Sequence, residues 1–178
     1  AKPFLKWAGG KSQLLKQFKA YFPLELVEGK ISRYVEPFVG SGAVFFFIAE
    51  NFRVQEFFIS DINKELILAY KTIREDVDSL IHILSEIQDN YFSCTPDEQK
   101  SFFYKTRSKF NVNRNKINFR EYEKSWLERS AQIIFLNRTC FNGLLRKGDI
   151  LRSIRINKNS FTVSLEDDLG RLMETKRL

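Results

Sequence analysis

The sequence has little of what builds metal centres and disulfide frameworks. Its only two cysteines, Cys94 and Cys140, lie far apart and outside any C-x-x-C pattern. This argues against a structural zinc site and favours reduced thiols, as in a cytosolic protein. The single histidine, His82, falls in a predicted helix with no acid or nucleophile constellation around it. A surface or capping role is therefore favoured over general-base catalysis, and no metal is expected.

Long hydrophobic runs are also absent. No stretch approaches the roughly 18 apolar residues that a membrane helix needs. The N-terminus meets Lys2, Lys6 and Lys11 before any long apolar run, unlike a signal peptide. We therefore expect a cytoplasmic protein with no membrane partner, and as a separate expectation a monomer. With 43% hydrophobic and 15% aromatic residues, the 178-residue chain is expected to fold around one core, with room for an inserted subdomain.

Positive charge is present in excess, and it is concentrated in one part of the chain. Residues 101–158 hold fourteen Lys and Arg and four acidic residues, a net charge of +10, which leaves −3 for the rest of a chain whose total is +7. This asymmetry favours a surface that faces a polyanion, although a soluble helical surface would give the same count.

Hydrophobic periodicity predicts a parallel α/β sheet in the first part of the chain and helices after it. In chain order we predict a helix over 12–22, a strand over 33–39, a buried helix over 43–51, a strand over 56–60, and helices over 64–72, 76–88, 100–110 and 119–136. From residue 147 the pattern is mixed, with alternation typical of short strands and then of a terminal amphipathic helix.

The segment Y-V-E-P-F-V-G-S-G-A-V-F-F, residues 34–46, is an apolar strand that leads through a glycine turn into an apolar helix. In α/β sheets this arrangement binds nucleotide-like cofactors, because Gly40 and Gly42 permit a tight turn and a close approach to a ligand. The helix that follows offers its free N–H groups. By itself a G-x-G turn is a weak signal.

Asp61 follows the second predicted strand, about 20 residues after the glycine turn. That is the distance at which nucleotide-binding α/β folds place a carboxylate on ribose hydroxyls, since its oxygens can accept hydrogen bonds from a vicinal diol. The alternative is that Asp61 only caps the next helix. The glycine turn upstream favours the ligand.

The N-terminal loop K-W-A-G-G-K-S resembles a phosphate-binding loop only superficially. A P-loop requires an earlier glycine, and Leu5 stands at that position; no strand precedes the loop either. What remains is a glycine turn flanked by Trp7, which can cover an apolar or cationic ligand, and Lys11, which can pair with a carboxylate. Alternatively, Trp7 is a core residue and Lys11 faces solvent.

A third cluster, F-L-N-R-T-C-F-N-G-L-L-R, ends at Arg146. It gathers the amides of Asn137 and Asn142, the guanidinium groups of Arg138 and Arg146, and the ring of Phe141. Asn can pair with adenine, Arg with guanine or phosphate, and an aromatic ring can stack against a displaced base. Alternatively, a helix ends here and Phe141 is a core residue. The basic surroundings favour contact with nucleic acid.

These motifs, in this order, resemble the Dam-type (D12 class) family of DNA adenine N6-methyltransferases. The matching segments are K-W-A-G-G-K at residues 6–11, E-P-F-V-G-S-G at 36–42, D-I-N at 61–63 and N-R-T-C-F-N-G-L-L-R at 137–146. The resemblance implies a Rossmann-like S-adenosylmethionine-dependent fold with an incomplete sheet and a helical DNA-recognition insertion. It covers about residues 1–146.

The resemblance also implies methyl transfer from S-adenosylmethionine to the exocyclic amine of adenine in double-stranded DNA, in restriction-modification or DNA marking. The expected cofactor-binding residues are Trp7, Lys11, Phe38, Gly40, Gly42 and Asp61. The expected DNA-binding residues are Asn137, Arg138, Phe141, Asn142 and Arg146. The DNA sequence that is recognised does not follow from these motifs.

One family motif is missing. The family's catalytic D-P-P-Y does not occur, because none of the four prolines belongs to a D-P-P triplet, and we therefore predict no catalytic residue. We expect a truncated or altered member with a cofactor-binding part over 1–72, a target-recognition part over 73–150 and a divergent segment over 151–178. The alternative function is a DNA-binding module without catalysis.

Overall fold

A parallel strand–helix–strand unit forms the first part of the molecule. The computed structural model describes residues 3–7 and 11–140; in it β1 (Arg33–Glu36) and β2 (Glu56–Ile59) pair in parallel, connected by α3 (Ala43–Asn51). The predicted parallel pairing and the helix over 43–51 are confirmed. Both strands are shorter than predicted, although the Val39 N–H still donates to the Ser60 carbonyl, 3.0 Å away.

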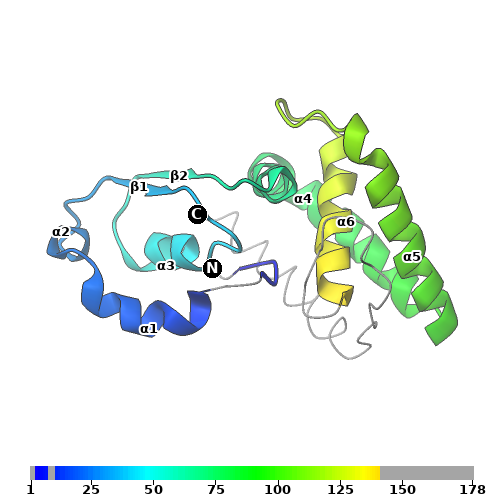
Figure 1. Cartoon of the computed structure of the whole chain (residues 1–178), viewed down its shortest axis with the longest axis horizontal. Coiled ribbons are helices and arrows are strands. Elements are labelled where there is room, and N and C mark those ends of the chain that lie inside the picture. Colours follow the sequence, from blue (N-terminus) through cyan, green and yellow to red (C-terminus); the bar gives the residue numbers. More distant parts are fainter. Residues whose placement is uncertain (1–2, 8–10, 141–178) are drawn as a thin grey trace.

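One face of this sheet is covered by α3, and among residues 3–7 and 11–140 nothing covers the other. Phe45 of α3 meets Phe57 of β2 edge to face, with ring centroids 5.4 Å apart. On the opposite face, Val35 and Phe58 are 61% and 52% exposed. Parallel sheets are normally covered on both faces, and two strands are marginal alone. Within the described residues the sheet is thus a small, half-covered unit, at the left of Figure 1.

Short helices precede the sheet. η1 (Lys11–Leu14), α1 (Leu15–Phe18) and η2 (Lys19–Tyr21) follow one another directly, where the pattern predicts one helix over 12–22. α2 (Leu24–Val27) is not predicted, because four residues are too few to show a helical period. Phe22 stacks on Phe47 of α3 with ring centroids 5.9 Å apart, which packs this stretch against α3.

α4 (Lys64–Phe92) is a long helix with a break inside it. Asp76 has non-helical angles (φ −153°, ψ 67°), and its Oδ1 accepts a hydrogen bond from the Ser79 N–H at 3.2 Å. An acceptor placed three residues ahead is typical of a helix N-cap, so Asp76 starts the second half anew. This confirms the prediction of two helices separated just before Asp76.

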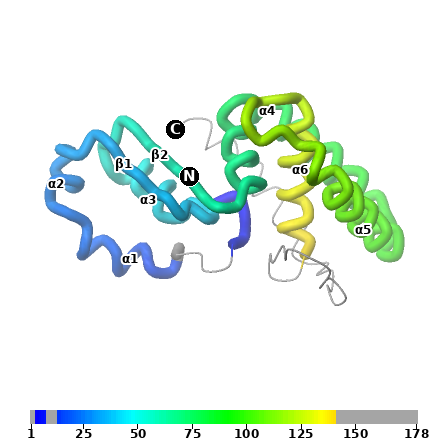
Figure 2. The backbone as a smooth tube through the Cα atoms, turned by 45° about the horizontal axis from the view of Figure 1, so that its top comes forward, coloured from blue at the N-terminus to red at the C-terminus, as the bar shows by residue number. Residues whose placement is uncertain are grey.

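Two further helices pack with α4 to form the second part of the molecule. α5 (Pro96–Val112) begins with a capping box between Thr95 and Glu98, and η3 (Asn113–Lys116) follows it. α6 (Ser125–Thr139) packs against both α4 and α5, as Figures 1 and 2 show. It begins later than the predicted residue 119, because the Asn118 carbonyl is held by the Trp126 indole N–H at 2.7 Å.

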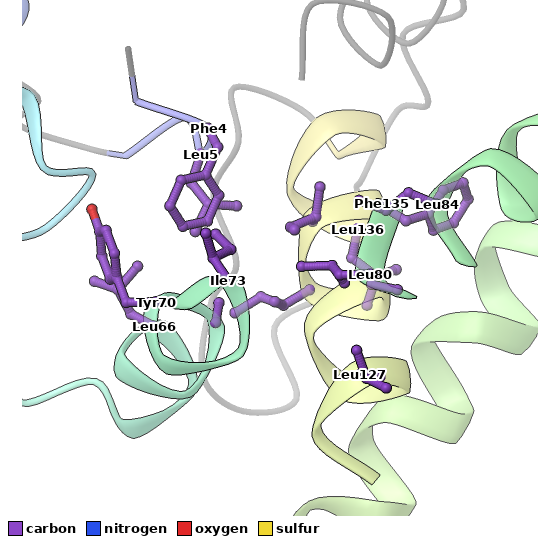
Figure 3. Close-up of a cluster of buried hydrophobic side chains, with 14 of the residues drawn as sticks. Phe4, Leu5, Leu66, Tyr70, Ile73, Leu80, Leu84, Leu127, Phe135 and Leu136 are labelled. Atoms are coloured by element: carbon purple, nitrogen blue, oxygen red, sulfur yellow. The ribbon is translucent and has the colours of Figure 1, made fainter. Parts of the chain in front are cut away.

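One hydrophobic core joins the two parts. Phe4 and Leu5 of the N-terminal segment lie against Tyr70 and Ile73 of α4, and the same cluster continues to Leu136 of α6 (Figure 3). The core therefore passes through the predicted boundary at residue 72, and the division into two domains stays a prediction.

In the part of the chain that the structure describes, no helix is both long and apolar enough to cross a membrane. The same described residues contain no group of three or more metal-ligating acidic, Cys or His side chains.

Candidate functional site

Trp7, Gly40 and Asp61 converge where the two strands end. The Gly40 N–H donates to Oδ2 of Asp61 at 3.0 Å, and a Cβ placed on Gly40 would lie 3.2 Å from Cδ1 of Trp7. The carboxyl ends of parallel strands are where open α/β sheets bind their ligands. Three residues that the sequence singles out separately are thus brought together at the edge of the sheet where a ligand is expected.

Asp61 is half-buried, and each of its oxygens holds one backbone N–H. Oδ2 accepts from Gly40, and Oδ1 accepts from Asn63 at 2.9 Å. The side chain that caps α4 belongs to Asn63, whose Oδ1 accepts from the Glu65 N–H at 3.1 Å, so capping is not the task of Asp61. An ionised carboxylate has about four acceptor sites. Acceptor capacity for two hydroxyl groups of a ligand therefore remains.

Tyr70 of α4 holds the glycine turn in place. Gly40 and Gly42 both have left-handed backbone angles, with φ of +53° and +78°, and the Tyr70 hydroxyl donates to the Gly40 carbonyl at 3.3 Å. Burial raises the pKa of Tyr70, and Glu36 and Asp61 raise it further, so the phenol stays protonated as a donor. The N–H and the carbonyl of Gly40 are therefore both fixed.

Replacing Gly42 with alanine should destabilise the chain by about 2–4 kcal/mol. A new Cβ would lie 2.4 Å from the Tyr70 hydroxyl and 3.0 Å from the Phe46 ring, in addition to the left-handed strain. Gly29→Ala is the matched control, because it has a similar φ of +71° but meets only Arg53 side-chain atoms, no closer than 3.6 Å. Urea unfolding checks both variants; equal losses would contradict the packing role of Gly42.

Phe38 and Ile62 leave the same edge of the sheet and are exposed. Phe38, a predicted cofactor residue, is 83% exposed, and Ile62 is 90% exposed. Sequence reasoning missed Ile62, although its place directly after Asp61 marks it as a neighbour of the same edge. Exposed large apolar side chains beside a polar site are typical of surfaces that receive a ligand.

The N-terminal loop is described only in part. Trp7 is partly buried, packs against the core and lies beside Gly40, which supports its interpretation as a core residue; that it covers a ligand stays a prediction. Residues 8–10 and the side chain of Lys11 lie outside the described part, and the predicted role of Lys11 stays a prediction.

Asn137 and Arg138, both predicted to contact DNA, are buried on α6, with exposed fractions of 0% and 3%. The Asn137 amide pairs with the main chain of Lys6, and Nη2 of Arg138 donates to the Phe4 carbonyl at 2.6 Å. In this structure neither side chain faces a duplex; both hold the N-terminal segment. The other three predicted DNA contacts, Phe141, Asn142 and Arg146, lie outside the described residues.

A buried ion pair joins the first turn of α4, close in sequence to Asp61, to α6. Arg129 of α6 donates to both carboxylate oxygens of Glu65, from Nε at 2.9 Å and from Nη2 at 2.5 Å. Its Nη1 donates to the Phe110 carbonyl at the end of α5, and its guanidinium lies 3.5 Å from the centroid of the Phe110 ring. From the sequence alone, Arg129 counts as part of the surface charge. Its position near apolar residues of a predicted helix was the feature that could have indicated its burial.

Of the fourteen Lys and Arg residues in 101–158, Arg129 and Arg138 are buried, so fewer than fourteen are exposed. Those that the structure describes as exposed extend along α5, η3 and the segment before α6. They are Lys105, Lys109, Arg114, Lys116, Arg120 and Lys124. The helical part therefore still carries a cationic surface, which suits a polyanion.

Comparison with known proteins gives consistent matches. Residues 7–153 match the model of D12 class N6 adenine-specific DNA methyltransferases. The chain is 48% identical over 145 residues to the Type II methyltransferase M.MjaIII of Methanocaldococcus jannaschii, a match that covers 82% of this chain and 48% of that protein. It is 33% identical over 162 residues to the DNA adenine methylase of Haemophilus influenzae, covering 91% of this chain and 46% of that one.

A third relative is the DNA N-6-adenine-methyltransferase of Escherichia phage P1, 39% identical over 141 residues, which are 79% of this chain and 15% of the phage protein. The chain thus spans about half the length of the archaeal and Haemophilus relatives, and less of the phage one. The family match contains three of the four motifs singled out above and all of the first motif except Lys6.

Proposed function

The chain belongs to the family of D12 class N6 adenine-specific DNA methyltransferases, and from this we propose that it binds S-adenosylmethionine for methyl transfer to the exocyclic amine of adenine in double-stranded DNA. The observation that carries the proposal is the convergence of Trp7, Gly40 and Asp61 at the carboxyl ends of two parallel strands. The arrangement suits a Rossmann-like cofactor site.

The residues present fit this cofactor. Asp61 keeps acceptor capacity for a ribose diol after binding the N–H groups of Gly40 and Asn63. Phe38 and Ile62 offer apolar surface for a flat base at the same edge, and the Trp7 ring can lie near the sulfonium cation. Lys11 is proposed to pair with the carboxylate of the amino-acid end. When bound, S-adenosylmethionine supplies an electrophilic methyl group.

The chain's own contribution to the reaction is to hold and orient. The positions of Gly40 and Asp61 are fixed by hydrogen bonds to each other and to neighbouring groups, which favours a preorganised site. The sequence has no D-P-P triplet to hold the target amine. We therefore assign this chain cofactor binding and DNA recognition, and no proton-transfer step.

The helical part is proposed to serve as the DNA-recognition insertion. Exposed cations on η3 and beside it, such as Arg114 and Lys116, can neutralise backbone phosphates. Phe141, Asn142 and Arg146 are proposed to reach the bases, since they match the family's DNA-contacting segment. Asn137 and Arg138 are not assigned to DNA, because they are buried against the N-terminal segment.

A chimaera tests this proposal. Residues 1–146 of this chain, placed in M.MjaIII in exchange for the matching region, should transfer tritiated methyl from S-adenosylmethionine to DNA. After digestion to nucleosides, the label should appear in N6-methyladenine. The same chimaera with Asp61→Ala is the control and should be inactive while still binding DNA. A chimaera that binds both the cofactor and DNA but labels no adenine would contradict the proposal.

An alternative function is a DNA-binding module without catalysis, which the missing D-P-P-Y motif favours. Calorimetry on the unmodified chain separates the two. Heat from S-adenosylmethionine supports the methyltransferase assignment, whereas salt-dependent binding of DNA without any cofactor heat supports the module.

A further inference from the structure

The side chain of Asn137 pairs with the main chain of Lys6 in both directions. The Lys6 N–H donates to Oδ1 and Nδ2 donates to the Lys6 carbonyl, each at 2.8 Å, although 131 residues separate the two in sequence. Exchange of both hydrogen bonds with one residue is what a neighbouring antiparallel strand would provide. Because Asn137 is buried and every residue of α6 from 129 to 139 is buried with it, this pairing fixes the main chain at Lys6.

The fixed main chain leads directly into the candidate site. Trp7 is the next residue, and its ring lies against Gly40, whose N–H is held by Asp61. On the other side of Lys6, the Phe4 carbonyl accepts from Nη2 of Arg138 at 2.6 Å. Consecutive residues of α6 thus anchor the segment at two points just before Trp7.

We propose that Asn137 is a positioning residue of the cofactor site, which acts through the Lys6 main chain to place Trp7 on the glycine turn. The inference rests on the proposed function. Without the amide, the Lys6 N–H and carbonyl lose their partners, and the segment must shift to satisfy them in water. The Trp7 ring then loses its fixed place on Gly40.

The primary test compares two polar residues of α6. Asn137→Ala should weaken S-adenosylmethionine binding, measured by calorimetry, by about tenfold to a hundredfold, as expected for two lost hydrogen bonds. Ser130→Ala is the matched control: Ser130 is equally buried, but its hydroxyl pairs with Thr72 of α4 at 2.9 Å, away from the N-terminal segment. It should lower the melting temperature and leave cofactor affinity within twofold.

A double-mutant cycle separates positioning from general loss of structure. If Asn137 acts through Trp7, the effects of Asn137→Ala and Trp7→Ala on cofactor affinity should be strongly non-additive, whereas those of Ser130→Ala and Trp7→Ala should add. Additive effects for the first pair, or equal losses from Asn137→Ala and Ser130→Ala, would overturn the inference. If the wild-type chain bound no S-adenosylmethionine, the proposed function would fail instead.

A second variant guards against misfolding. Asn137→Leu fills about the same volume and buries no charge, but it removes both the acceptor for the Lys6 N–H and the donor to the Lys6 carbonyl. It should weaken cofactor binding in the same direction and show the same non-additivity with Trp7→Ala. Wild-type affinity in this variant would count against the inference as much as wild-type affinity in Asn137→Ala.

Discussion

Replacing Arg129 with alanine is expected to lower the free energy of unfolding by about 3–5 kcal/mol, a large share of the roughly 5–15 kcal/mol of a typical domain. The guanidinium is buried, pairs with both oxygens of Glu65 and caps the end of α5 at the Phe110 carbonyl. Its removal leaves the Glu65 carboxylate facing the helices with no counter-charge. Urea unfolding followed by circular dichroism measures the loss.

The chain offers a matched control for this prediction. Lys109 and Glu128 also form an ion pair between α5 and α6, but both side chains are more than half exposed. Lys109→Ala should therefore cost no more than about 1 kcal/mol. The double variant Glu65→Leu, Arg129→Met replaces both buried partners with apolar residues. It should recover much of the stability lost in Arg129→Ala, because no unpaired charge remains. An Arg129→Ala loss as small as that of Lys109→Ala would show that the pair does not join the helices.

Replacing Asp61 with alanine is expected to weaken S-adenosylmethionine binding at least about a hundredfold, roughly 3 kcal/mol. The change removes the acceptors for the ribose diol and also releases the N–H groups of Gly40 and Asn63 that shape the turn. DNA affinity should stay within about twofold, because the cationic surface lies on the helical part. Calorimetry for the cofactor and fluorescence anisotropy for DNA measure the two effects.

Two further substitutions serve as controls for the effect of Asp61→Ala on cofactor affinity. Asp61→Asn keeps the shape and one acceptor oxygen, so it should retain part of the binding and fall between the wild type and Asp61→Ala. Asp89→Ala removes an exposed carboxylate near the far end of α4 and should change nothing. The assignment would be wrong if Asp61→Ala and Asp89→Ala bound the cofactor equally well.

Features set by neighbouring residues were predictable from the sequence. The helix over 43–51 follows from a glycine turn and an apolar run, and the break at Asp76 follows from an acidic residue between two helical patterns. The glycine turn and Asp61 were identified because their spacing reflects a strand–helix–strand unit. The structure then adds the contact that spacing alone cannot give, the hydrogen bond from Gly40 to Asp61.

Features set by distant residues were not predictable in this way. Asn137 and Arg138 are polar residues in a basic segment, which is typical of a DNA surface. Their true surroundings depend on Lys6 and Phe4, more than 130 residues away in sequence. The same holds for Arg129, whose partner Glu65 lies 64 residues earlier. A count of charged and polar residues places all three on the surface, because it does not show that α6 is packed between other elements and buried.

The most direct test of the cofactor site is a titration of the ¹⁵N-labelled chain with S-adenosylmethionine, followed by NMR. The chain has two tryptophans, Trp7 at the proposed site and Trp126 on α6, buried and bonded to the Asn118 carbonyl. We predict that the Trp7 indole and Gly40 amide signals shift and saturate at one equivalent, while the Trp126 indole signal stays in place. Unchanged Trp7 and Gly40 signals at saturating cofactor, or shifts confined to the helical part, would contradict the account.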